Sequence, residues 1–172
     1  MQFSAGAADA EIALNELRRL VQGLRLSAHA VERSLGISGA QLFVLRELAA
    51  EPGVSIRRVS ERTLTDASSV STVVSRLVER GLVNRTRQAS DARASCLVVS
   101  RRGAGLLARA PEPYQARVIA ALRALEPGRL REFRLALSEV VDALDLERGE
   151  APLFFEAEAN ERTKKRDRRR RT

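Results

Sequence analysis

The chain has 172 residues, of which 44% are hydrophobic, and it carries a formal net charge of +8. With no tryptophan, one tyrosine and five phenylalanines, its core must be built from aliphatic side chains, which favours packed helices in a single domain with extensions. No apolar stretch approaches the ~18 residues of a membrane helix, the N-terminus lacks a secretory pattern, and the single cysteine excludes an internal disulfide. We therefore expect a cytoplasmic protein that does not enter a membrane.

Positive charge is concentrated in two segments. Residues 55–102 carry a net charge of +6 and residues 162–172 carry +7, whereas residues 1–54 and 103–161 carry −1 and −4. Because clustered arginines displace counterions from phosphates, this asymmetry predicts a polyanionic partner for the middle segment. The basic run at the C-terminus is of low complexity and is predicted to be disordered. It either adds non-specific affinity for such a partner or only keeps the chain soluble.

Apolar periodicity predicts three helices in the first third of the chain. A long helix runs from Glu11 to about Ser34. A second helix begins after Ser38, which forms a capping-box pattern with Gln41. A third, short helix has Ser55 as its N-cap.

After a break near Thr65, a stripe of apolar side chains at helical spacing predicts a fourth helix that ends near Gly81. We interpret this stripe as core; it consists of Val70, Val73, Val74, Leu77 and Val78. The opposite face is small and polar, with Ser68, Ser69, Ser71, Thr72, Ser75 and Arg76. Two short antiparallel strands, LVNRT and CLVVS, are predicted next, around a polar loop that carries Arg87 and Arg93.

The C-terminal third is predicted to be helical with proline breaks. One helix is capped by Ser100 and interrupted at Pro111 and Pro113, and the helical pattern resumes from Tyr114 to Leu125. The Pro-Gly pair at 127–128 separates a last helix, whose apolar positions are Leu130, Phe133, Leu137, Val140, Val141 and Leu144. The segment after this helix is predicted to be irregular.

The predicted elements of the middle segment follow one another in the order of a winged helix-turn-helix. They are a short helix, a tight break, a second helix with a small polar face, and a hairpin with a basic tip. A recognition helix must be buried on one side and must let DNA approach closely on the other. Hydroxyl side chains meet this need without bulk. An arginine at a hairpin tip suits the minor groove, whose negative potential attracts guanidinium groups. The order of elements therefore predicts a protein that binds double-stranded DNA.

Residues 55–103 resemble the DNA-binding core of the MarR (multiple antibiotic resistance regulator) family. The segment SSVSTVVSRLVERGLVNR resembles that family's recognition helix and its exit. The segment SDARASCLVVSRRG resembles its wing, with position-for-position matches at Asp91, Arg93, Ser100 and Gly103. A looser resemblance extends over residues 11–146.

The resemblance implies roles for individual residues. Arg93 would reach the minor groove, and Asp91 would brace the wing by pairing with an arginine such as Arg76 or Arg93. The residues that would face DNA are Ser68, Ser69, Ser71, Thr72, Arg76 and Arg93. Candidate phosphate contacts are Arg57, Arg58 and Arg87. Arg57 and Arg58 are equally consistent with a solvated face, and Arg93 has the alternative of a solvated hairpin residue.

Two positions depart from the family's pattern. The wing has alanine between Asp91 and Arg93, where many members carry a second arginine. Thr72 stands where a longer basic side chain is common. Both departures remove charge or reach, so we expect less direct base readout and a larger contribution from DNA shape.

The resemblance also implies the overall organisation: a mainly α fold with a small β-hairpin wing, in which N- and C-terminal dimerisation helices flank a winged helix-turn-helix. The expected units are an N-terminal dimerisation helix, a DNA-binding core, C-terminal dimerisation helices and an irregular segment with a basic tail, at residues 1–34, 35–103, 104–148 and 149–172. The expected protein is a homodimeric repressor with a pseudo-palindromic operator. A small aromatic effector would bind between the dimerisation helices and the winged unit.

Other classes of function remain as alternatives or are excluded. The sequence has no glycine-rich phosphate loop, no HExxH and no credible nucleophile–base pair, so we expect no enzyme, cofactor or metal site. His29 has no ligand-type neighbours at metal spacing, and Cys96 is either a structural strand residue or a redox sensor. The two alternatives are a DNA-architectural protein without sequence preference and a winged-helix module that binds only proteins.

Overall fold

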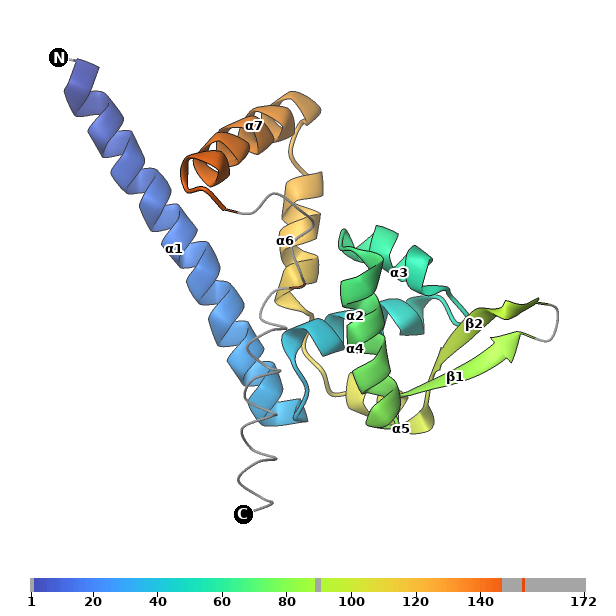
Figure 1. Cartoon of the computed structure of the whole chain (residues 1–172). Coiled ribbons are helices and arrows are strands. Elements are labelled where there is room, and N and C mark those ends of the chain that lie inside the picture. The colour runs from blue at the N-terminus through green and yellow to red at the C-terminus, as the bar shows by residue number, and fades with distance from the viewer. Residues whose placement is uncertain (1, 89–90, 147–152, 154–172) are drawn as a thin grey trace.

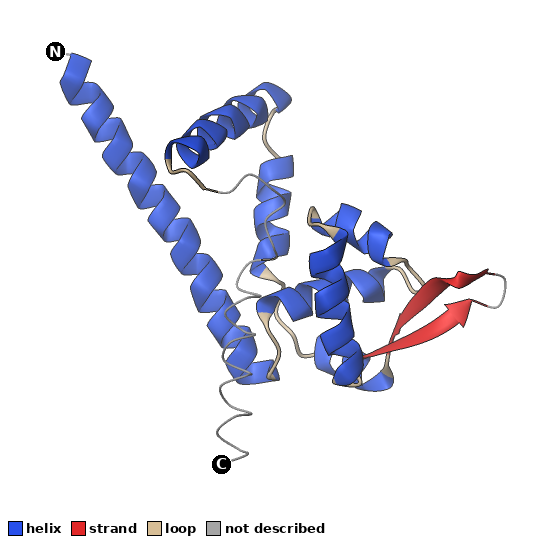
Figure 2. Cartoon of the chain, in the orientation of Figure 1, coloured by secondary structure: helices blue, strands red, loops and turns tan. Residues whose placement is uncertain are grey.

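The computed structural model contains seven helices and one two-stranded antiparallel sheet within the residues it describes. Its backbone description covers residues 2–88, 91–146 and 153, and side chains are described for residues 6–85, 96–146 and 153. Helices dominate, and the two strands form a hairpin on one side (Figure 2). The predicted fold class, mainly α with a small β-hairpin wing, is confirmed.

The elements follow the predicted order along the chain (Figure 1). Their bounds are α1 Gln2–Leu35, α2 Gly39–Ala50, α3 Ile56–Thr63, α4 Ala67–Glu79, β1 Val83–Gln88, β2 Asp91–Val99, α5 Arg101–Leu107, α6 Tyr114–Arg123 and α7 Pro127–Ala143.

Local capping chemistry sets several of these bounds as predicted. The Ser38 hydroxyl accepts the Gln41 backbone N–H at 3.1 Å, and the Gln41 side chain accepts the Ser38 N–H at 3.1 Å, which completes the capping box of α2. Ser55 accepts the N–H of Arg58 at 3.2 Å at the start of α3. Each bond satisfies a backbone donor that the first turn of a helix leaves unpaired.

Two predicted helix starts were wrong. Helix α1 begins at Gln2 and not at Glu11, because the intervening residues include four alanines and no proline and so extend a helix readily. Helix α7 begins at Pro127, which was expected to lie in a separating loop. Proline is well suited to the first position of a helix. The Glu126 carboxylate accepts the N–H of Gly128 at 2.9 Å and that of Arg129 at 3.1 Å.

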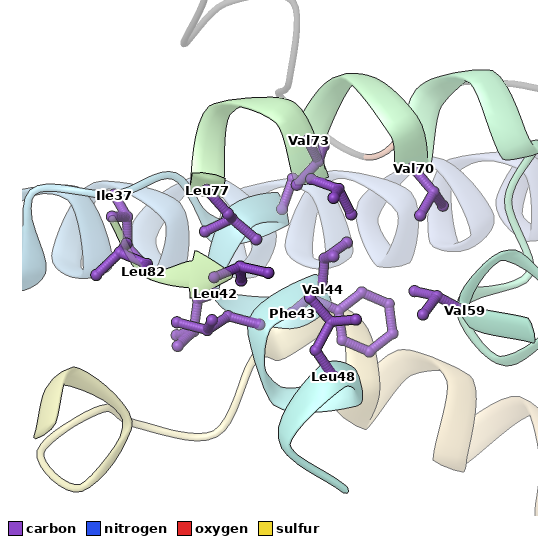
Figure 3. Close-up of a cluster of buried hydrophobic side chains, with 14 of the residues drawn as sticks. Ile37, Leu42, Phe43, Val44, Leu48, Val59, Val70, Val73, Leu77 and Leu82 are labelled. Carbon is purple, nitrogen blue, oxygen red and sulfur yellow. The ribbon is translucent and has the colours of Figure 1, made fainter. Parts of the chain in front are cut away.

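The core lies among α2, α3, α4 and the base of the hairpin, with α2 at its centre (Figure 3). Helix α2 is buried around most of its circumference, which is expected of a central helix. The α4 stripe predicted as core is buried at Val70, Val73, Val74 and Leu77, while Val78 is half-buried. The core also includes Leu153, only 2% exposed, which follows α7 by ten positions.

The outer helices α1, α6 and α7 surround the core only partly. Helix α1 contacts α2 and α6 through its C-terminal half, whereas its N-terminal half extends away from the α2–α5 cluster (Figure 1). At the α1–α6 crossing, a Cβ at Gly23 would overlap the hydroxyl of Tyr114, so glycine permits the close approach. Apart from Leu153, the segment 149–172 predicted to be irregular and disordered lies outside the described residues.

Candidate nucleic-acid interface

Helix α4 begins at an aspartate that binds its first turn. Asp66 is the N-cap, and its carboxylate accepts the backbone N–H of Ser69 at 2.7 Å and the hydroxyl of Ser68. These hydrogen bonds, with that from Ser68 the largest cause, lower the pKa of Asp66 to about 2. The sequence prediction missed this residue, although an aspartate three positions before Ser69 and next to an apolar stripe is an N-cap signal.

The hydroxyls on the outer face of α4 are partly engaged within the helix. Ser68 and Thr72 are exposed, whereas Ser69, Ser71 and Arg76 are half-buried. The Thr72 hydroxyl donates to the Ser68 carbonyl at 3.1 Å, and the Ser75 hydroxyl donates to the Ser71 carbonyl at 2.9 Å. A hydroxyl that donates to its own helix retains lone pairs that accept hydrogen bonds. The exposed face of α4 thus offers acceptors and the methyl group of Thr72.

The first helix of the helix-turn-helix, α3, carries a network of ion pairs. Arg57 pairs with Glu61 at 3.4 Å, and Arg58 pairs with Glu61 at 3.3 Å and with Glu51 at 3.8 Å. The side chain of Arg57 is 88% exposed and that of Arg58 is 56% exposed, so both guanidiniums are accessible to a polyanion. Any phosphate that binds them competes with the carboxylate of Glu61. The sequence prediction missed this acidic partner, which its spacing of three and four positions could have revealed.

Strands β1 and β2 form the predicted hairpin, but they are longer than predicted, so Arg87 lies in β1 and Arg93 in β2 and not in a polar loop. The register runs from Val83 opposite Val99 to Arg87 opposite Ser95. An irregularity between Arg87 and Gln88 then places Gln88 opposite Asp91. The backbone of Arg87, Asp91 and Arg93 therefore belongs to the wing, while their side chains lie outside the described residues. Arg85 on β1 is exposed and was missed as a candidate DNA contact.

The wing is joined to α4 and α5 by a serine and a glycine of the predicted motif. The Ser100 hydroxyl donates to the Gly81 carbonyl at 2.7 Å and accepts the N–H of Gly103 at 3.0 Å. A Cβ at Gly103 would overlap the Leu82 carbonyl oxygen and would lie 2.9 Å from Cγ1 of Val99. Helix α5 therefore packs directly on the backbone of the hairpin base.

Two further arginines fix the orientation of the helix-turn-helix. Arg62 on α3 donates to Glu47 and, at 3.0 Å, to Glu51, and hydrogen bonding to Glu47 is the main cause that raises the pKa of its guanidinium. Arg80, just after α4, donates to the Gly36 carbonyl in the α1–α2 turn. Helices α3 and α4 are thereby held against α2 and the α1–α2 turn, and the hydroxyls of α4 lie in the same unit as the accessible cations of α3. A unit that combines hydroxyls with accessible cations suits a DNA duplex, whose grooves lie between two lines of phosphates.

The described part of the chain shows neither a metal site nor a membrane span. Its residues contain no group of three or more His, Cys, Asp or Glu side chains placed to hold a metal ion. No helix in the same part is long and apolar enough to cross a bilayer.

Comparison with known proteins supports the interpretation of the chain as a DNA-binding protein. A sequence model of the MarR family matches residues 35–94. The PcaV transcriptional regulator from Streptomyces coelicolor has 31% sequence identity and a TM-score of 0.51, over 76% of this chain and 96% of that protein. A second structure of it, in complex with its natural ligand, gives 31% identity and a TM-score of 0.50 over 74% and 90%.

A more distant structure shares the fold. The transcriptional regulator BldR from Sulfolobus solfataricus has 20% identity and a TM-score of 0.51, over 78% of this chain and 96% of that protein. None of the curated proteins matches the chain. The chain has a winged helix-turn-helix, and it shares 31% sequence identity with PcaV over 96% of that regulator. It therefore belongs to the MarR family and is a DNA-binding transcriptional regulator rather than an enzyme.

Proposed function

We propose that this regulator is a homodimeric, ligand-responsive repressor that binds a pseudo-palindromic operator with one winged unit on each half-site. The observation that carries the proposal is the pairing of two surfaces on one chain. One is the polar face of α4 beside the hairpin, and the other is a set of exposed apolar side chains on α1 and α7.

The apolar faces of α1 and α7 support the dimer. Ile12 is 62% exposed, Phe133 is 45% exposed and Val140 is 50% exposed, although each belongs to a stripe at helical spacing. Contiguous exposed apolar surface marks an interaction site, and two-fold dimers are the commonest assembly. We therefore assign the dimer interface to residues 1–34 and 104–148 and the DNA-binding unit to residues 35–103.

The arrangement of α4 and the hairpin supports the mode of DNA binding. The α4 residues Ser68, Ser69, Ser71, Thr72 and Arg76 would enter the major groove. Arg93 would reach the minor groove with Asp91 as its brace, and the phosphate contacts would be Arg57, Arg58 and Arg87. In a two-fold dimer the two α4 helices would occupy successive major grooves, ~34–36 Å apart. A protein of this kind acts on chromosomal DNA, so we place it in the cytoplasm.

A hollow between α2, α3 and α6 supports the binding of an effector. It has a volume of about 680 Å³, which is within the range of small-molecule sites. Its lining combines apolar side chains and arginines with one acid: Phe43, Ala116, Ile119, Ala120, Ala124, Arg58, Arg62, Arg123 and Glu47. This chemistry suits a small aromatic acid, and PcaV, which is similar to this chain, has a structure with its natural ligand. Binding there would change the position of α6 relative to the winged unit and release DNA.

Selection of DNA fragments bound by the purified protein tests the proposal, with the spacing of the recovered half-sites as the first measurement. We expect a spacing of one helical turn and an affinity that falls steeply between ~50 and ~200 mM salt. Equal affinity for selected and bulk DNA would favour the architectural alternative. An affinity for DNA no greater than that of a neutral control protein would favour the protein-interaction module.

The wing assignment is tested on the selected fragment with Arg93→Ala. We expect a loss of affinity of about tenfold or more, because one specific groove contact contributes ~1–3 kcal/mol. Arg109→Ala, an exposed arginine after α5, is the matched control and should bind within about twofold of the parent. Equal binding by Arg93→Ala and the parent would show that the wing arginine does not contact DNA.

A further inference from the structure

One arginine belongs both to the lining of the hollow and to the proposed DNA contacts. Arg58 on α3 lines the hollow between α2, α3 and α6. It is also one of the arginines assigned to phosphates, and its side chain is 56% exposed. Helix α3 is the first helix of the helix-turn-helix, the one that crosses the DNA backbone in such motifs. A single guanidinium is thus available to two anions, one in the hollow and one on a duplex.

The other arginine that α3 contributes to the hollow is already neutralised. Arg62 donates to Glu47 and, at 3.0 Å, to Glu51. The side chain of Glu47 is only 20% exposed, so the loss of Arg62 would leave a partly desolvated carboxylate without its partner, which is costly. Arg62 therefore holds α3 on α2 and is not the group that a bound acid would take.

Arg58 is held less firmly than Arg62. Its contacts with Glu61 at 3.3 Å and with Glu51 at 3.8 Å join side chains that are between 46% and 56% exposed. Exposed ion pairs of this kind contribute little net stability, so an incoming anion can replace these carboxylates. On the α6 side of the hollow, Arg123 lies in the last turn of the helix. It forms no ion pair with any residue whose side chain is described.

The inner wall of the hollow is apolar. Phe43 on α2 is 2% exposed, and Ala116 and Ile119 on α6 are half-buried. An aromatic ring suits this wall, whereas a carboxylate requires the two exposed cations, Arg58 and Arg123, on the solvent side. The hollow thus matches a small aromatic acid with its ring inward and its acid group outward.

We propose that an aromatic carboxylate bound in the hollow pairs with Arg58 and Arg123 and thereby withdraws Arg58 from a DNA phosphate, so that effector and DNA compete for one guanidinium. This inference rests on the proposed function, because it names the group through which the effector acts on the same DNA. The competition takes place within each winged unit and requires no change in the distance between two units. By linkage, effector and DNA weaken the binding of each other by the same factor.

The loss of one phosphate contact determines the size of the effect. Each neutralised phosphate contributes ~0.9 to the slope of log affinity against log salt. At ~0.1 M salt this slope corresponds to about eightfold in affinity for each phosphate. Because Glu51 and Glu61 already compete for the same guanidinium, we expect a loss of about fivefold for each winged unit.

Benzoate, a simple aromatic carboxylate, tests the proposal on the full chain and the selected DNA fragment. Sodium chloride at equal ionic strength is the control for screening, and neutral benzamide is the control for the ring. Saturating benzoate should lower the affinity about fivefold and make the salt slope shallower by ~0.9, both for each winged unit. Benzamide should do neither. An unchanged salt slope, or an equal effect of benzamide, would overturn the proposal.

Arg58→Gln and Arg57→Gln form a matched pair of variants. The two arginines are neighbours on α3 and share Glu61 as a partner, but Arg58 lines the hollow and Arg57 does not. Both substitutions should weaken DNA binding. Arg58→Gln should also bind benzoate about fivefold or more weakly in calorimetry without DNA, because a charge-assisted contact is lost.

The response of each variant to benzoate decides the question. At benzoate concentrations that saturate each variant, the DNA affinity of Arg58→Gln should change by less than about twofold, whereas Arg57→Gln should respond like the parent. Equal responses of the two variants, or an unchanged benzoate affinity of Arg58→Gln, would overturn the proposal. Both side chains are exposed, so neither substitution disturbs the core.

The outcomes separate this inference from the proposed function. If benzoate releases DNA from the parent and from Arg58→Gln alike, the hollow binds an effector that acts through movement of the helices, and this inference alone fails. If benzoate does not bind the parent, the assignment of the hollow to an aromatic acid fails together with this inference. A parent that binds no duplex would overturn the proposed function as a whole.

Discussion

Replacing glycine by alanine is expected to have opposite effects on stability at two positions of the same short helix. Gly103 and Gly105 both lie in α5, where replacing glycine by alanine stabilises a helix by ~0.5–1 kcal/mol. At Gly105 an added Cβ would meet nothing within 4 Å. At Gly103 it would overlap the carbonyl oxygen of Leu82 and press on Cγ1 of Val99 at 2.9 Å. The backbone oxygen of Leu82 cannot rotate away, so α5 must move from the hairpin.

The magnitudes follow from these surroundings. Overpacking in a tight site costs ~1–3 kcal/mol, and contact with backbone places Gly103→Ala near the upper end. After the gain in helix propensity, we expect Gly103→Ala to lower the free energy of unfolding by about 2 kcal/mol. Gly105→Ala should raise it by ~0.5–1 kcal/mol. For a chain of this size, these values correspond to a Tm about 4–8 °C lower and ~1–4 °C higher, respectively.

Urea unfolding followed by circular dichroism measures both variants. The protein concentration must be the same throughout, because association makes the apparent stability depend on concentration. If Gly103→Ala is as stable as the parent or gains as much as Gly105→Ala, α5 does not pack on the hairpin backbone as described. If both substitutions lower the free energy of unfolding, α5 does not tolerate an added methyl group at either position. The close approach at Gly103 would then not be the cause of the loss.

Three more predictions concern the DNA-binding surface and its cap. The Thr72 hydroxyl donates to its own helix and leaves its methyl group exposed. Thr72→Val, which keeps this methyl group, should therefore keep the preference among operator variants, and Thr72→Ala should weaken it. If both variants lose the preference equally in a competition assay, the hydroxyl contacts DNA. Glu61→Gln should tighten duplex binding about two- to fivefold, because it removes the carboxylate that pairs with both Arg57 and Arg58 and leaves Arg58 only its longer contact with Glu51. Glu132→Gln on α7 should not change the affinity, and weaker binding by Glu61→Gln would refute the reasoning. The pKa of Asp66 is lowered to about 2 from ~3.9 in unfolded chains. The contribution of the ionised carboxylate to the free energy of unfolding is therefore fully present above pH ~4 and is lost as the pH falls through about 2. Asp66→Ala should therefore unfold at lower urea at pH 7, and its midpoint should approach that of the parent near pH 2; a constant difference across this range would contradict the cap.

The features that the sequence predicted are those set by neighbouring residues. The capping box of α2 and the N-caps at Ser55 and Ser100 depend on residues three positions apart, so a short pattern suffices to find them. The core stripe of α4 was found because a helix repeats every 3.6 residues. The start of α7 was missed because the Pro-Gly pair at 127–128 was interpreted as a break, although the pair also suits a first helical turn behind Glu126.

The features that the sequence could not predict depend on residues far apart in the chain. Arg80 donates to Gly36 across 44 positions, and Arg46 donates to the carbonyl of Ala110 at 2.8 Å across 64 positions. An arginine on a helix carries no local sign of which distant carbonyl it will meet. The burial of Leu153 belongs to the same class, because the sequence around it was predicted to be irregular. Only the packed structure brings these partners together.

These long-range contacts connect the outer helices α1 and α6 to α4, so a rearrangement of the outer helices would change the position of α4. Near its C-terminal end, α1 contributes Val31, only 1% exposed, to the core, and Arg80 then ties the turn after α1 to the end of α4. Arg46 ties α2 to the segment that leads into α6. A helix of 34 residues is about 50 Å long, so a tilt of ~10° at one end displaces the other by about 9 Å. We therefore expect a small rearrangement between α1 and α6 to move α4 as part of a rigid unit, and a shift of that size separates a recognition helix from its groove.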